Sequence, residues 1–226
     1  MQNTIESNEK RGRKSFFGYI EVVFNIVYLI SAFMMGMYIF SKGGETFYFL
    51  AGAMAMLLAI GDAFHLIPRI AAVMAGRSEK IERLLGFGKL ITSITMTVFY
   101  VLLWHIGIGR FQGQREQWTL LIYAFAAIRI FLCLLPQNGW YEKEPSLKWA
   151  VIRNIPFVFL GLAVILLFGL NGGSFKELRY LWLAALFSFI FYIPVVIWAG
   201  KYPKIGMLMI PKTCMYLWIL LMLMSV

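Results

Sequence analysis

The sequence predicts an all-α, polytopic integral membrane protein with seven transmembrane helices. Hydrophobic residues make up 61% of the 226-residue chain and charged residues only 14%, whereas soluble domains average about 25% charged residues. The apolar residues also gather into seven stretches of the length that a helix needs to cross a bilayer, about 20 residues. We expect spans at residues 16–40, 46–67, 84–108, 118–136, 149–170, 180–199 and 205–226.

Prolines and turn residues account for the ends of these spans in chain order. The first span follows a polar segment, residues 1–14, which lacks the apolar stretch and cleavage site of a signal peptide. Pro68 lies at the end of the second span, and prolines within the fifth and sixth are expected to kink or end those helices. Asn138 and Gly139 indicate a turn after the fourth span, and residues 171–174, Asn-Gly-Gly-Ser, indicate a flexible loop after the fifth. We therefore expect a tail of residues 1–15 and one transmembrane domain of residues 16–226.

The basic residues of the connecting segments predict the orientation in a cell membrane. Cytoplasmic loops carry an excess of Lys and Arg, and the side that holds the amino terminus has thirteen of them against five on the other. The thirteen are Lys10, Arg11, Arg13, Lys14, Arg69, Arg77, Lys80, Arg83, Lys143, Lys148, Arg153, Lys201 and Lys204. We expect a cytoplasmic amino terminus and an external carboxyl terminus. The net charge of +10 indicates attraction to anionic membrane lipids and not to nucleic acid, because the basic residues are spread over several loops.

Ionisable residues inside the spans share one depth. At a helical rise of about 1.5 Å per residue, they lie roughly 7 to 11 Å inside the cytoplasmic edge of the membrane. These residues are Glu21, Asp62, Lys89, Arg129 and Lys212. Charged groups in hydrocarbon are costly unless they face a cavity, form pairs or perform chemistry. The layer therefore predicts a functional site, although polar groups can also serve only to hold helices together.

Helical spacing predicts which of these side chains share a face. Residues three, four and seven apart lie on one side of a helix, so Glu21, Asn25 and Tyr28 form one polar stripe. Asp62 and His65 belong to a second stripe. Such stripes are expected to face the interior of the bundle and not the lipid.

The balance of charge in this layer favours an anionic ligand. The layer contains two carboxylates and three cations, and the cations are Lys89, Arg129 and Lys212. Arginine side chains suit phosphate and carboxylate ligands. A phospholipid headgroup that enters from the cytoplasmic leaflet fits this balance. A proton relay remains an alternative, because pumps also place acids beside a His.

The residue inventory argues against a metal site. Catalytic zinc takes three protein ligands, whereas the chain has two His residues, His65 and His105, which are on the order of 20 Å apart in depth. We therefore expect neither a metal nor another cofactor. Cys133 and Cys214 lie in or near the inner half of the membrane, where we expect free thiols.

Residues 52–68, Gly-Ala-Met-Ala-Met-Leu-Leu-Ala-Ile-Gly-Asp-Ala-Phe-His-Leu-Ile-Pro, resemble the Gly-Asp-Ala helix of the YhhN family, whose characterised members are lysoplasmalogenases. The resemblance implies hydrolysis of the vinyl-ether bond of a lysophospholipid, with release of an aldehyde and with intramembrane carboxylates as the acid and base. The chain departs from the family in its single Asp and in having seven spans where eight are usual.

The chemistry of such a hydrolase assigns roles to the buried residues. A carboxyl group that burial keeps protonated can act as the general acid, and Asp62 and Glu21 are the two candidates. His65 or Tyr28 would position the water. The substrate would be bound by Lys89, Arg129, Lys212, Asn25 and Tyr28.

A transporter is the alternative class of function. Seven spans can form two three-helix units joined by an inverting fourth helix, and internal repeats are common in transporters. In that case the same polar layer would bind a small molecule or carry protons across the membrane.

Overall fold

The computed structural model describes the chain except for residue 1, residues 112–115 and residues 143–144. The described residues form α-helices and short 3-10 helices and contain no strand. The α-helices are α1 (Gln2–Ser41), α2 (Thr46–Ala75), α3 (Glu79–Phe111), α4 (Glu116–Leu134), α5 (Leu147–Asn171), α6 (Leu181–Trp198) and α7 (Met209–Met224). The 3-10 helices are η1 (Pro136–Asn138), η2 (Gly172–Ser174) and η3 (Pro203–Leu208). The predicted all-α class is confirmed.

Seven of the described helices are long and apolar enough to cross a membrane, so the chain is a multi-pass membrane protein by length and composition. Their outer surface supports this assignment. Large apolar side chains such as Leu120, Leu166 and Leu170 are more than half exposed. An apolar belt of this extent is unusual on a soluble monomer, whereas lipid tails solvate it without cost.

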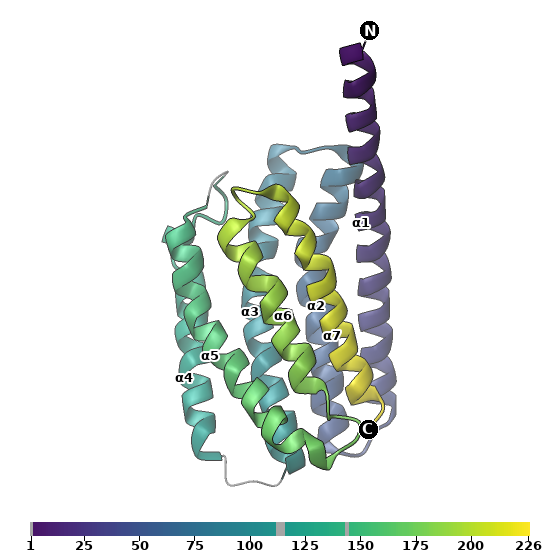
Figure 1. Cartoon of the computed structure of the whole chain (residues 1–226). Helices are drawn as coiled ribbons and strands as arrows, with labels where there is room; N and C mark the ends of the chain where they lie inside the picture. The colour runs from purple at the N-terminus through teal and green to yellow at the C-terminus, as the bar shows by residue number, and fades with distance from the viewer. Residues whose placement is uncertain (1, 112–115, 143–144) are drawn as a thin grey trace.

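Several helices are longer than their hydrophobic stretches. α1 begins at Gln2 and includes most of the segment that was predicted as a polar tail. Figure 1 shows this first part of α1 projecting beyond the other helices. α2 and α3 also extend past the predicted spans toward the same end. Hydropathy locates the part of a helix that lies in hydrocarbon, whereas the backbone can remain helical beyond that boundary.

The helices pack as a closed ring in chain order. Each helix contacts the next one along the chain, and α7 returns to contact α1. α3 also packs against α5, which places it toward the centre of the bundle (Figure 1). The two chain ends lie at opposite ends of the bundle (Figure 1), as an odd number of crossings requires. We call the end that carries the amino terminus the amino-terminal end.

Glycines allow α2 and α3 to approach closely. A Cβ atom added at Gly88 would collide with the carbonyl oxygen of Phe64, and one added at Gly61 would collide with Thr95. Small residues are the usual means by which membrane helices bring their backbones together. This contact fixes the position of the α2 segment that carries Asp62 and His65.

Reporter fusions test the predicted orientation. A reporter that is active only in the cytoplasm should work when it is fused before residue 16 and should fail when it is fused after Val226, because most basic loop residues lie on the amino-terminal side. The measurement is reporter activity in intact cells, with a reporter active only outside the cytoplasm as the reciprocal control. Cytoplasmic activity from both fusions would contradict this topology.

Candidate functional site

A cavity of about 1030 Å³ opens at the amino-terminal end of the bundle, between residues of α2, α3, α4, α5, α6 and α7. Its wall carries six Lys or Arg side chains and, among the described residues, no Asp or Glu. The basic residues of the wall are Arg69, Lys89, Arg129, Arg153, Lys201 and Lys212. Fixed charge of one sign in a low-dielectric cleft concentrates ligands of the opposite sign. The cavity is therefore built to attract anions.

Arg129 is the most deeply buried cation of the wall. Its side chain is 2% exposed, and the centre of its guanidinium lies 3.3 Å from the centroid of the Phe157 ring. Its Nε and Nη1 atoms are buried and have no hydrogen-bond partner among the described residues. The cation–π contact recovers part of the cost of burial, but two donors of a buried charged group remain available. An anion in the cavity would complete their hydrogen bonding.

Lys212 approaches the cavity from α7 between two tyrosines. Its Nζ atom lies 4.7 Å from the ring centroid of Tyr192 and 5.2 Å from that of Tyr216, and the residue is 7% exposed. No direct ion pair joins Lys212 to an acid among the described residues. The Lys212 ammonium is thus free to bind a ligand.

The connection between α4 and α5 fixes the position of Arg153. Arg153 Nη1 donates a hydrogen bond of 2.9 Å to Asn138 Oδ1, and its guanidinium lies 4.2 Å from the Trp140 ring centroid. Asn138 is fully buried, and its Nδ2 donates to the carbonyl oxygens of Leu132 and Leu135 at 2.6 and 2.8 Å. Only an amide can donate to these carbonyls while it accepts from an arginine. The end of α4 therefore orients a cation of the wall.

The two carboxylates of the polar layer lie outside the cavity wall. Tyr28 donates a hydrogen bond of 2.6 Å to Asp62 Oδ2, and Glu21 forms an ion pair with Arg69. Both contacts join α1 to α2. The described hydrogen-bond partner of Asp62 is thus a tyrosine hydroxyl and not a basic side chain. Glu21 and Tyr28 of the α1 stripe thus contact α2.

The predicted site residues therefore divide into two groups. His65, Lys89, Arg129 and Lys212 line the cavity. Glu21, Asn25, Tyr28 and Asp62 lie at the contact between α1 and α2 or beside it. His65 is the one candidate acid or base that reaches the wall, and its Nδ1 atom is buried without a partner among the described residues.

Sequence reasoning missed the residues that orient the cations. Asn138 was interpreted only as part of a turn, and the cavity contacts of Trp140, Phe157 and Tyr192 were not anticipated. Each of these side chains acts on a cation from another part of the chain, so spacing within one helix gives no signal for it. The other His, His105, lies near the opposite end of α3, where its Nε2 atom is 2.6 Å from the Tyr123 hydroxyl.

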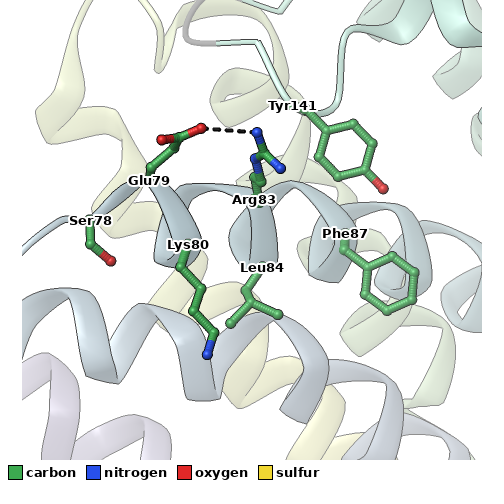
Figure 2. A pocket seen from close by; sticks show the side chains of 7 residues that line it. All are labelled: Ser78, Glu79, Lys80, Arg83, Leu84, Phe87 and Tyr141. Atoms are coloured by element: carbon green, nitrogen blue, oxygen red, sulfur yellow. Dashed lines mark hydrogen bonds and ion pairs between the residues drawn. The ribbon is translucent and has the colours of Figure 1, made fainter.

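A second pocket, of about 680 Å³, has exposed basic residues and serves as a comparison for the cavity. Figure 2 shows it beside the first turns of α3, with Tyr141 at its edge. All its lining residues are exposed, and Arg83 Nη2 donates a hydrogen bond of 2.9 Å to Glu79 Oε1. Exposed pairs of this kind contribute about 0 to 1 kcal/mol. Here the arginine is exposed and paired, whereas Arg129 is buried and two of its nitrogens have no described partner.

No group of three or more His, Cys, Asp or Glu residues that could hold a metal ion is found in the described part of the chain. Cys133 and Cys214 are free thiols. Comparison with protein-family models, curated proteins and solved structures finds no match to this chain. Its function is therefore inferred from the geometry of the cavity.

Proposed function

We propose that this membrane protein binds an amphiphile whose anionic headgroup occupies the basic cavity. The observation that carries the proposal is the wall itself, with six Lys or Arg side chains, no described acid, and Arg129 buried with two unpartnered nitrogens. A phosphate or carboxylate can accept from an arginine fork and from an ammonium at once. Lys212 and Arg153 supply the further donors.

The remainder of the wall favours an amphiphile over a wholly polar anion. Met96, Phe157, Val195 and Val196 line the cavity together with the basic residues. The helices that carry them belong to the set that can cross a membrane. Mostly apolar walls with a few placed polar groups are typical of ligand sites. A lysophospholipid, with one hydrocarbon chain and a phosphate, satisfies both parts of this wall.

The reaction that we assign to the site is hydrolysis of a vinyl-ether lysophospholipid, which the resemblance of residues 52–68 to the YhhN family implies. A general acid protonates the β-carbon of the vinyl ether, and water adds to the resulting oxocarbenium ion and returns a proton to the conjugate base of that acid. The hemiacetal then breaks into an aldehyde and a glycerol hydroxyl. We assign the protonation of the substrate to His65, which lines the cavity and would take up a proton once the bound phosphate offsets the positive charge around it. Asp62 lies three residues earlier on the same helix face. We assign it a positioning role, because its carboxylate holds the Tyr28 hydroxyl through their hydrogen bond. Glu21 is already committed to Arg69.

An assay of the purified protein tests this reaction. The protein should release aldehyde from a vinyl-ether lysophospholipid, and His65→Gln should lower the rate by about 10²- to 10⁴-fold, the usual contribution of a general acid. Asp62→Asn should also lower it, because Asn keeps the shape of Asp but cannot carry its charge. His105→Gln is the matched control, because it changes the other histidine, at the far end of α3, and should leave the rate unchanged.

A carrier is the second candidate, and the same preparation distinguishes it. Tyr100 and Phe189 pack behind Phe157, with ring centroids 5.1 and 5.0 Å from it. A carrier would have to open this aromatic layer to release its ligand on the other side. No aldehyde release by the unaltered protein, together with uptake of a labelled lysolipid or anion into sealed vesicles, would exclude the hydrolase and support the carrier.

A further inference from the structure

The aromatic rings at the cavity are occupied by the protein's own cations. Beyond the contact between Arg129 and Phe157, Arg153 lies over Trp140, Lys212 over Tyr192, and Lys201 over Tyr202 at 5.5 Å. Recognition of choline-like ammonium groups uses cages of several open aromatic faces. Trp198 is the fifth aromatic residue of the wall apart from His65, and a single ring does not make a cage. An ammonium group would thus find no aromatic cage here.

Carboxylates that could pair with an ammonium lie outside the described wall. The described wall has no Asp or Glu. The two acids nearest to it in the polar layer are held outside, Glu21 by Arg69 and Asp62 by Tyr28. A zwitterionic head such as phosphocholine or phosphoethanolamine would place its positive charge among like charges, without a partner. Opposed like charges are a common device by which binding sites reject a competing ligand.

The hydrogen-bond donors of the wall fit a headgroup that carries only negative charge. Arg129 and Lys212 are buried, and Arg153 is held in place by Asn138 and Trp140. A phosphate monoester has three terminal oxygens and a charge between about −1.5 and −2 at neutral pH, whereas a diester has two such oxygens and a single charge. Three cations on one cavity wall match the monoester in both number of oxygens and charge.

We propose that the cavity selects a terminal phosphate monoester over zwitterionic phosphodiester headgroups. The ligand class is then a single-chain amphiphile of the lysophosphatidate type, or a small phosphate monoester that shares its head. This selectivity rests on the proposed function, because both place the anion at the same residues.

Binding measurements on the purified full chain in detergent, at about 0.15 M salt, test this selectivity. The probes are lysophosphatidate, lysophosphatidylcholine with the same acyl chain, glycerol 3-phosphate and inorganic phosphate. We expect lysophosphatidate to bind at least tenfold more tightly than lysophosphatidylcholine. Tighter binding of lysophosphatidate than of glycerol 3-phosphate would identify the lipid as the ligand, and equal binding would identify the free monoester. Either result supports selection of the monoester.

A pair of charge reversals sharpens the test. Lys201→Glu places a carboxylate on the wall, whereas Lys204→Glu makes the same change three residues later; both residues are exposed, but Lys204 does not line the cavity. Charges that face solvent more than about 8 Å apart are largely screened at this salt. Lys201→Glu should weaken lysophosphatidate binding about tenfold or more without weakening lysophosphatidylcholine binding. Lys204→Glu should leave both affinities unchanged.

Failure of the selectivity and failure of the proposed function give different results. Equal binding of the two lysolipids, with both weakened by Arg129→Gln, would overturn the selectivity and leave the amphiphile site in place. No binding of any probe by the folded protein would overturn both.

Discussion

Arg129→Met will lower the affinity for a phosphate-headed amphiphile and raise the stability of the ligand-free protein. The lost charge-assisted hydrogen bonds are each worth about 1.5 to 3 kcal/mol, so binding should weaken by at least tenfold. Stability should rise because Arg129 is 2% exposed with two unpartnered nitrogens. Replacement even of buried ion pairs by apolar side chains of similar volume is often stabilising by about 1 to 4 kcal/mol, and Arg129 has no described ion-pair partner to lose. Opposite signs of the two effects distinguish a ligand-binding arginine from a structural one.

The matched control is Arg110→Met. Arg110 also has a buried Nε atom without a described partner, and its guanidinium lies 4.9 Å from the ring centroid of Phe175, but it does not line the cavity. Its substitution should leave lysolipid affinity unchanged. Affinity and thermal unfolding in detergent are the measurements. If Arg129→Met destabilises the ligand-free protein, the guanidinium supports the fold and the role assigned to it here is wrong.

Gly88→Ala will destabilise the protein strongly, whereas Gly109→Ala in the same helix will not. A Cβ atom at residue 88 would meet the Phe64 carbonyl and the Cα of His65. Backbone atoms cannot move aside as a side chain can, so α2 and α3 must separate. Overpacking typically costs about 1 to 3 kcal/mol and occasionally more, and we expect the upper part of this range.

Gly109 provides the control because no atom lies within 4 Å of a Cβ added there. Ala is also the better helix former, by about 1 kcal/mol in water, so Gly109→Ala should be neutral or slightly stabilising. Thermal unfolding of the two variants in one detergent measures the difference. Equal stability of both variants would mean that α2 and α3 are not packed as closely as described.

The fold was predictable because one property, hydropathy, determines which segments can cross a bilayer. All seven predicted spans coincide with helices of the described structure. Their ends were less predictable. α1 begins at Gln2, and the last span begins as η3 before it continues as α7. Local backbone hydrogen bonding determines these ends, and hydropathy reports on it only indirectly.

The grouping of the candidate residues could not be predicted from spacing along the chain. Lys89, Arg129 and Lys212 were placed in one layer by their distance from the span ends, and all three line the cavity. Asp62 shares that layer, but Tyr28 of another helix holds it outside the wall. The direction in which a side chain faces depends on the helices packed around it. Spacing along a single helix therefore did not separate the carboxylates from the cations.

An experimental map of the protein with bound lysophosphatidate tests the central claim most directly. The phosphate should lie within hydrogen-bonding distance of the Arg129 guanidinium, with Lys212 and Arg153 as further donors and the hydrocarbon chain along the apolar part of the wall. A headgroup bound instead at the exposed pocket beside Arg83, with no ligand density next to Arg129, would contradict it.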